Sequence, residues 1–170
     1  MPTLSQITKE TIREHINRAV NDVFSVMLSR SPTAQVQVGD GVSEQPDPTE
    51  SNQPMIVATV GFVGEVNGLV YLRFGVPFAR ICAGHLLGLQ DSELDDETVN
   101  DAIGEMANMT VGSFKNGLCD AGFPCMLTIP SVMKGGNLSI MPLRSTVRHV
   151  FQFDFAEHQV VADILVESGR

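Results

Sequence analysis

Hydrophobic residues recur at helical spacing in three stretches of this chain. The first lies within residues 1–30, with Thr8 as an expected cap, and the second begins at Pro77 and ends near Gly88. The third and longest covers residues 97–114. Along it, one stripe of mostly apolar side chains repeats every three or four residues: Ile103, Met106, Thr110 and Phe114. We therefore expect three helices, each packing one face against a core.

Other stretches are rich in β-branched and aromatic residues, which predicts strands. Residues 55–62 and 67–74 form two such runs around a short turn flanked by glycines, and they indicate a β-hairpin. Further strands are expected at 125–129, 138–141, 146–155 and 159–166. Residues 134–137, Lys-Gly-Gly-Asn, lack the full phosphate-loop pattern and are interpreted as a hairpin turn. The fold class is α/β (α+β), with a mixed β-sheet packed against long amphipathic helices.

The composition changes over residues 31–54 to Pro, Ser, Gln, Asp, Glu and Gly, which predicts a flexible loop. Within it, Val36 and Val38 alternate with polar residues and allow a short edge strand. The helix before this loop is too small to be stable alone. We therefore expect a single domain over residues 1–170, a length sufficient for one substantial core.

The net charge of −9 argues against nucleic-acid or anionic-membrane partners, because either would require a basic patch. An acidic surface is better suited to a protein partner. No run approaches the roughly 18 apolar residues of a membrane span, and no signal peptide precedes the first helix. We expect a cytoplasmic protein without membrane insertion. Three cysteines and four scattered histidines show no metal-ligand spacing, so no metal site is expected in this chain.

A polar face lies opposite the apolar stripe of residues 97–114. Asp101, Glu105 and Asn108 share it, with Gly104 and Gly112 beside them. Each glycine costs a helix about 1 kcal/mol relative to alanine, and close approach by another molecule would explain both. The alternative is an ordinary solvated face. The Glu-x-x-Asn spacing decides nothing alone, because the chain contains it three times.

The surroundings of Glu105 and Asn108 are more specific than their spacing. Residues 100–112, Asn-Asp-Ala-Ile-Gly-Glu-Met-Ala-Asn-Met-Thr-Val-Gly, resemble the helix signature of the CheC/CheX/FliY chemotaxis phosphatases. That signature is Asp/Ser-x-x-x-Glu-x-x-Asn followed by Gly, and the match is ungapped. The order of elements is also similar, and with one good motif the chain most resembles CheX. The resemblance implies a CheC-like fold.

It also implies an activity: a phosphatase that removes the aspartyl phosphate from a CheY-like response-regulator receiver domain. Asn108 would orient the attacking water, and Glu105 would clamp the receiver's lysine. Gly104 and Gly112 would leave room for the receiver's loops, while Asp101 is either a partner contact or a surface charge. The Mg²⁺ would be supplied by the receiver, so no cofactor is expected here. The resemblance, together with exposed edge strands, favours a homodimer.

Two alternatives remain open. Flagellar switch proteins of FliM type are similar in fold and lack the catalytic pair, so the chain could be a noncatalytic CheC/FliM-like module that docks receiver or flagellar switch proteins. It could also be an adaptor that captures phosphorylated receivers without hydrolysis. A second copy of the motif, Glu14 and Asn17, is followed by bulky residues and is interpreted as a solvated face. The sequence identifies neither the cognate receiver, nor the rate, nor whether the circuit is chemotaxis or other signalling.

Overall fold

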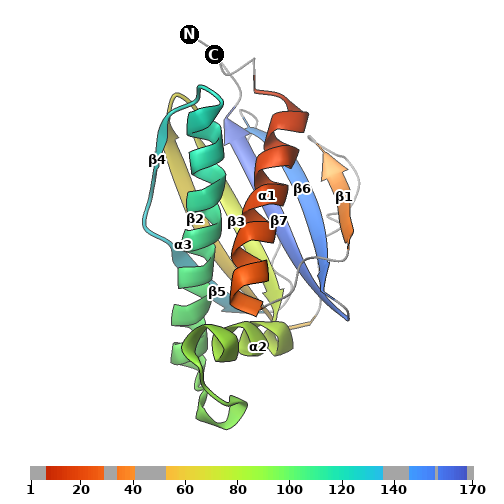
Figure 1. Ribbon diagram of the computed structural model, residues 1–170, viewed down its shortest axis with the longest axis vertical. Helices are drawn as coiled ribbons and strands as arrows, with labels where there is room; N and C mark the ends of the chain where they lie inside the picture. The colour runs from red at the N-terminus through yellow and green to blue at the C-terminus, as the bar shows by residue number, and fades with distance from the viewer. Residues whose placement is uncertain (1–6, 29–33, 41–52, 136–145, 156, 168–170) are drawn as a thin grey trace.

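In a computed structural model of the protein, the described part of the chain forms three α-helices and one seven-stranded sheet (Figure 1). The structure describes residues 7–28, 34–40, 53–135, 146–155 and 157–167. The helices are α1 (Lys9–Leu28), α2 (Val76–Leu87) and α3 (Asp96–Asp120), with a 3₁₀ turn, η2 (Asp91–Glu93), before α3. The strands are β1 (Ala34–Asp40), β2 (Met55–Gly64), β3 (Gly68–Gly75), β4 (Cys125–Leu127), β5 (Ser131–Gly135), β6 (Thr146–Phe155) and β7 (His158–Glu167).

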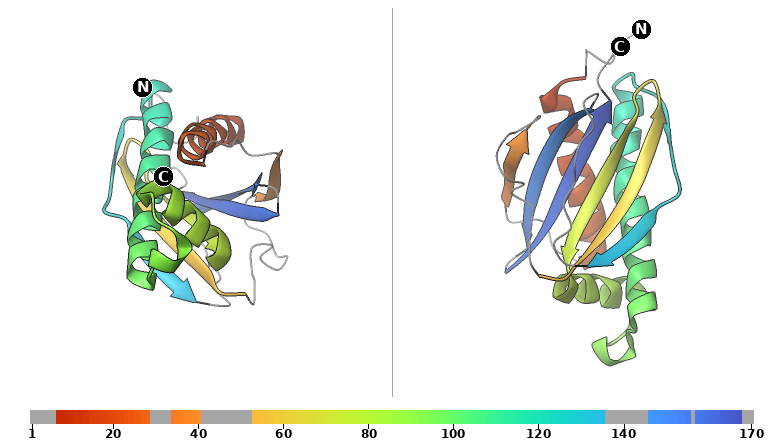
Figure 2. Two further views of the ribbon diagram at one scale, coloured as in Figure 1. Left: turned by 60° about the horizontal axis from the view of Figure 1, so that its bottom comes forward. Right: turned by 180° about the vertical axis from the view of Figure 1, so that it is seen from behind.

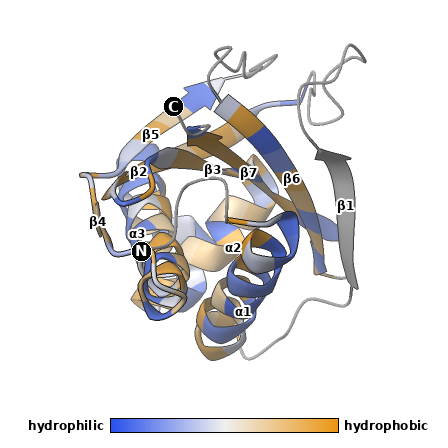
Figure 3. Ribbon diagram, turned by 90° about the horizontal axis from the view of Figure 1, so that it is seen from above, coloured by the Kyte–Doolittle hydropathy of each residue, from blue (hydrophilic) through white to orange (hydrophobic). Residues whose placement is uncertain are grey.

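The strand order is β1-β6-β7-β3-β2-β4, and β5 also pairs with β2. The sheet curves around the helices, which all lie on one of its sides (Figures 2 and 3). The predicted α+β class, a sheet packed against long amphipathic helices, is confirmed. Every strand pair in the described residues is antiparallel, where a mixed sheet was expected. For two of these pairs the reason is local: short turns join β2 to β3 and β6 to β7, and such turns can join only antiparallel strands.

The start of α1 and the end of α2 follow the predicted signals. Thr8 caps α1, because its Oγ1 accepts a hydrogen bond of 3.1 Å from the backbone N–H of Thr11. Helix α2 ends at Gly88, whose φ of 67° is the left-handed conformation that glycine adopts without strain. Asp95 caps α3 by accepting a 2.7 Å hydrogen bond from the backbone N–H of Thr98. Helix α3 continues six residues beyond its predicted end, to Asp120.

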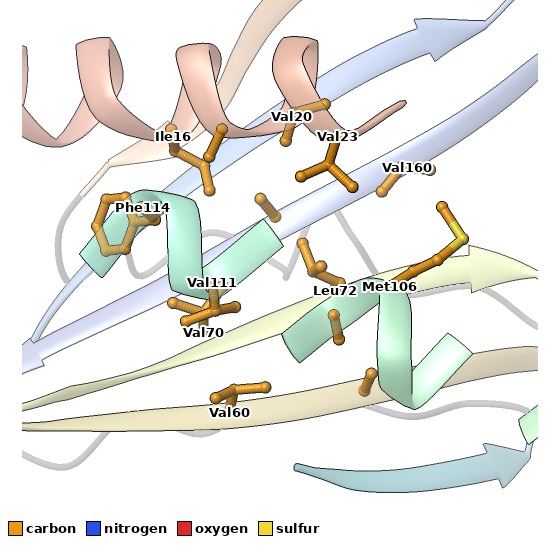
Figure 4. Packing of buried hydrophobic residues seen from close by; sticks show 14 of the residues in the cluster. Ile16, Val20, Val23, Val60, Val70, Leu72, Met106, Val111, Phe114 and Val160 are labelled. Carbon is orange, nitrogen blue, oxygen red and sulfur yellow. The ribbon is translucent and has the colours of Figure 1, made fainter. Parts of the chain in front are cut away.

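The core lies between the helices and the sheet. Apolar side chains from α1 and α3 meet those of β2, β3 and β7 there (Figure 4). Phenylalanine rings join α1 to the sheet, with Phe24 stacked 6.1 Å from Phe74 and 5.2 Å from Phe155 between ring centroids. This packing fixes one face of α3 and leaves its opposite face outside the core.

A charged cluster is buried on the other side of the sheet. Arg73 alternates with the core residues Leu72 and Phe74, so it points away from the helices. Its Nη2 lies 4.0 Å from Oδ2 of Asp163, and Nε of Arg148 donates to Oδ1 of the same carboxylate at 2.9 Å. Asp163 is fully buried, so the two guanidinium groups hold a carboxylate that would otherwise be costly to desolvate.

One stretch confirms a predicted strand, and another departs from the predicted elements. Residues 34–40 of the predicted 31–54 loop form β1 at the edge of the sheet, which confirms the edge strand expected there. Residues 131–135 form β5, a strand that the sequence did not predict, and Lys134 lies in it opposite Ile56 instead of in a hairpin turn. The predicted strand 138–141 and loop residues 41–52 lie outside the described residues. The single-domain expectation remains a prediction.

Candidate functional site

Helix α3 presents the candidate site because its packing fixes its rotation. The predicted stripe is fully buried: Ile103, Met106, Thr110 and Phe114. The Thr110 hydroxyl donates to the Met106 carbonyl at 2.7 Å, so this polar member of the stripe is satisfied within the helix. The placement of the apolar stripe is therefore confirmed, and the polar face is left for contact with solvent or a partner.

Glu105 and Asn108 lie on this outer face, one helical turn apart. Glu105 is exposed and Asn108 is half-buried. Side chains three residues apart on a helix are neighbours, with about 5–6 Å between their Cβ atoms. Among the described residues, neither side chain takes part in a hydrogen bond or ion pair. The carboxylate therefore keeps its acceptors free, and the carboxamide offers both donor and acceptor to an incoming molecule.

Asp101 is exposed four residues before Glu105. It makes no hydrogen bond or ion pair within the described ranges. Two carboxylates on one face increase its negative charge. This placement suits a partner contact and a surface charge equally, so the role of Asp101 remains a prediction.

Gly104 and Gly112 lie deeper than the sequence indicated. Gly104 is buried, and a Cβ atom there would lie 3.3 Å from Cγ2 of Val132 in β5. Gly112 is half-buried, and a Cβ atom there would lie 3.7 Å from Cδ1 of Leu127 in β4. The prediction of an exposed Gly104 is therefore wrong, because β5, which was not predicted, covers that flank of α3. A partner-binding role for the two glycines stays a prediction.

The second copy of the motif, on α1, differs in its hydrogen bonding. The Nδ2 of Asn21 donates to the Asn17 carbonyl at 2.8 Å and to its Oδ1 at 3.2 Å. Glu14 lies 3.6 Å from the guanidinium of Arg18. Both motif side chains are thus engaged within their own helix, in contrast to Glu105 and Asn108. This arrangement supports the interpretation of the α1 copy as a solvated face.

A pocket of about 300 Å³ lies between α2 and η2, and no candidate residue lines it. Its Arg80 is already occupied: Nε donates to Oδ1 of Asp91 at 2.8 Å, and Nη2 donates to the carbonyls of Asp91 and Leu94 at 2.9 and 3.1 Å. These contacts fasten the loop that leads into α3. Arg80 thus helps to set where α3 begins.

The described residues offer no alternative nucleophile among their buried cysteines. Burial raises the pKa of the Cys82 thiol to about 12 and that of Cys125 to about 11, so both are protonated at neutral pH. Within the same residues, no group of three or more His, Cys, Asp or Glu side chains is arranged to hold a metal ion. None of the described helices is long and apolar enough to cross a membrane.

Comparison with known proteins identifies similar sequences and folds. The family model described as "Chemotaxis phosphatase CheX" matches residues 56–154, a range that contains all of α3. No curated protein matches the sequence.

Similar solved structures include a chemotaxis protein CheX from Desulfovibrio desulfuricans, at 22% identity and a TM-score of 0.72, covering 92% of this chain and 99% of that one. CheX from Vibrio vulnificus has 20% identity and a TM-score of 0.74, with coverages of 92% and 99%. A CheX-CheY-BeF₃-Mg²⁺ complex from Borrelia burgdorferi has 20% identity and a TM-score of 0.70, with coverages of 91% and 97%. These likenesses, and one to a CheC-like superfamily protein from Shewanella sp. PV-4 at 20% identity and a TM-score of 0.74, with coverages of 95% and 100%, confirm the CheC-like fold.

Proposed function

Because the chain belongs to the CheX family of chemotaxis phosphatases, we propose that it removes the phosphoryl group from the aspartyl phosphate of a CheY-like receiver domain. The observation that carries this proposal is the pair Glu105 and Asn108, exposed or half-buried on one face of α3 and without partners in the described part of the chain. The similar Borrelia burgdorferi protein was solved in complex with CheY, BeF₃ and Mg²⁺, which supports a receiver as the partner.

Asn108 acts by positioning water. Its carboxamide oxygen accepts a hydrogen bond from the water, and its NH₂ group donates a hydrogen bond to an acceptor beside the water. This arrangement holds the water oxygen in line with the phosphorus–oxygen bond to the aspartyl group. The new phosphorus–oxygen bond forms as that bond breaks. The products are inorganic phosphate and the receiver's free aspartate. Phosphoryl transfer needs little covalent help from a protein, so orientation accounts for most of this contribution.

Glu105 acts as a clamp on the receiver. An ionised carboxylate only accepts hydrogen bonds, and a lysine ammonium group beside the phosphoryl group is a matching donor. Because Glu105 is exposed, the pair becomes desolvated only when the receiver docks. Glu105 therefore contributes to the affinity of the complex as well as to turnover.

The metal ion belongs to the receiver in this proposal. Mg²⁺ prefers about six oxygen ligands in octahedral geometry. The side chains of Asp101, Glu105 and Asn108 project from one helix face and cannot enclose a metal ion from all sides. The chain itself then holds no cofactor. Bound Mg²⁺ would neutralise charge on the phosphoryl oxygens while Asn108 orients the water.

The remaining parts of the proposal concern the surroundings of the site. Asp101 contacts the receiver. The lack of side chains at Gly104 and Gly112 lets β4 and β5 pack close to α3 and leaves room for the receiver's loops. A homodimer is expected from sheet extension, because β1 pairs with β6 alone among the described strands and leaves its other edge free. The expected location is the cytoplasm.

The test uses receiver domains from the same genome, each phosphorylated with acetyl phosphate, and measures phosphate release with and without the protein. Asn108→Ala should lower kcat by about 10²- to 10³-fold, as for other lost positioning groups, with little change in receiver affinity. Glu105→Ala should weaken binding and kcat/KM together, by about 1.5–3 kcal/mol. Asn116→Ala, an exposed asparagine two turns further along α3, is the matched control.

Binding without phosphate release would instead support the noncatalytic module or the adaptor.

A further inference from the structure

The chain after α3 returns along the sheet edge as β4 and β5, both paired with β2. Phe62 lies opposite Leu127, and Thr59 lies opposite Ser131. Between these two pairs, β2 has two residues, 60 and 61, whereas the returning strand has three, 128–130. The returning strand therefore carries one extra residue, which is a β-bulge. Bulges redirect side chains at sheet edges and next to active sites.

Thr128 fixes the start of the bulge, and Pro130 follows at its end. The backbone N–H of Thr128 donates to the Gly61 carbonyl at 2.9 Å, and its Oγ1 accepts from the Gly61 N–H at 2.8 Å. Pro130 has no N–H to donate, as is common at bulges and edges. Between them, Ile129 is 88% exposed, the highest fraction of any large apolar side chain described.

This bulge lies level with Asn108. The residue before it, Leu127, is next to Gly112, and Val132 beyond it is next to Gly104. Both glycines are four residues from Asn108, or about 6 Å along the helix axis. Residues between Leu127 and Val132 therefore run beside the part of α3 that carries Asn108.

Asn108 also faces the flank on which the returning strand lies. Four residues turn an α-helix by about 400°, so Asn108 lies only about 40° further round α3 than Gly104. Its half-buried state, beside the exposed Glu105, agrees with this placement. Ile129 and the carboxamide of Asn108 therefore lie at the same height along α3 and on the same side of it.

The other exposed apolar side chains of this edge point away from the helices. Met126 pairs with Val63 and Met133 pairs with Val57, and both β2 residues alternate with core residues. Met126 is 76% exposed, and its cross-strand partner Val63 is 57% exposed. Met133 in β5 is 50% exposed. Among the described exposed apolar side chains of this edge, Ile129 is therefore the one that lies in the bulge beside Asn108.

We infer that Ile129, presented by this bulge, is an apolar docking contact for the receiver domain and helps to determine which receiver is bound. The inference rests on the proposed function, because the occupant is the partner that reaches Asn108. A receiver placed with its phosphoryl group at Asn108 also covers the side of α3 next to the bulge. Its surface there meets Ile129. The contact adds affinity without touching the reacting atoms.

The test compares Ile129→Ser with Val26→Ser. Val26 is 77% exposed on α1 and is a matched exposed β-branched residue outside this edge. The affinity for a receiver carrying BeF₃⁻ as a phosphate mimic is measured by titration, and phosphate release is measured at varied receiver concentration. Ile129→Ser should raise Kd and KM by roughly 10- to 100-fold, as expected for losing a buried isoleucine contact, with kcat unchanged. Val26→Ser should match the wild type.

Each result has one meaning. If the wild type releases phosphate and Ile129→Ser keeps the wild-type Kd within twofold, the inference is overturned while the proposed function stands. If the wild type neither binds nor dephosphorylates any receiver, the proposed function fails and the inference fails with it. Sedimentation of both variants tests whether a second copy of the chain covers this edge instead of the receiver. Loss of a dimer in Ile129→Ser without a change in the receiver Kd assigns this edge to the second copy and overturns the inference.

Discussion

The three glycines of α3 provide a graded test of the packing around the candidate site. Replacing a helix-interior glycine by alanine gains about 1 kcal/mol of intrinsic helix stability, and this gain is the same at Gly104, Gly112 and Gly117. What differs is the room for a new methyl group. The nearest heavy atom to an added Cβ is 3.7 Å away at Gly112, 3.3 Å at Gly104 and 2.4 Å at Gly117.

These distances predict three different outcomes. At Gly112 the contact with Leu127 is of ordinary van der Waals length, so Gly112→Ala should keep the full gain and raise Tm by about 2–4 °C. At Gly104 the methyl group presses on the end of the Val132 side chain, and Gly104→Ala should be close to neutral. At Gly117 the methyl group would overlap the His15 ring, and overpacking costs about 1–3 kcal/mol. Gly117→Ala should therefore lose up to about 2 kcal/mol.

Thermal unfolding followed by circular dichroism measures all three variants under identical conditions. A Tm for Gly112→Ala below the wild type, or a Tm for Gly117→Ala equal to that of Gly112→Ala, would refute the packing described for β4 and α1 against α3. Receiver affinity adds a second readout. If Gly112 leaves room for the partner, Gly112→Ala should weaken receiver binding even while it stabilises the fold.

Three further predictions concern groups outside the candidate pair. Asp163→Ala should destabilise the protein by about 3–5 kcal/mol in urea unfolding, because it removes the buried carboxylate that both buried arginines contact. A loss below about 1 kcal/mol would contradict this account of the cluster. The double variant Glu14→Ala/Asn17→Ala should retain phosphatase activity, and loss of most activity in a folded protein would make α1 a second site. Hydrogen bonds from the Thr98 side chain and backbone lower the pKa of Asp95, so its stabilising effect is present above the unfolded pKa of about 3.9 and is lost as the pH falls through the lower folded value. The Tm difference between wild type and Asp95→Ala should therefore be present at pH 7 and shrink below about pH 4, and a constant difference would argue against this cap.

The sequence predicted the elements whose signals are local. Helix α3 was identified because its apolar stripe holds one spacing over several turns, and its buried face is the predicted one. The β2–β3 hairpin and the end of α2 at Gly88 also carry their own turn and cap residues. In each case the residues that specify the element lie within it or immediately beside it.

Features formed by distant residues were missed. Strand β5 follows Pro130, is short and has mostly exposed side chains, so it shows no alternation that marks a half-buried strand. Without β5, the flank of α3 at Gly104 looked open. The buried pair Arg73 and Asp163 joins two strands, and the two residues are 90 positions apart in sequence. The sequence signalled this pair only by one arginine and one aspartate, each within an otherwise apolar run.

The candidate site shows the same division. Spacing alone could not distinguish the Glu-x-x-Asn copy of α3 from that of α1, and the resemblance of residues 100–112 to a family signature favoured α3. The structure adds a physical difference, because Asn17 is hydrogen-bonded within α1 whereas Asn108 has no such partner in the described chain. The bulge beside Asn108 depends on the register between β2 and the returning strand. Such a register is set by long-range pairing, which is why the sequence did not indicate it.

The most direct test of the central claim is a single measurement with three samples: the rate of phosphate release from a phosphorylated receiver alone, with saturating wild type, and with saturating Asn108→Ala. The proposed role of Asn108 predicts that the wild type accelerates release and that Asn108→Ala loses about 10²- to 10³-fold of the wild-type kcat while still binding the receiver. Release at the wild-type rate by Asn108→Ala, or no acceleration by the wild type, would contradict it.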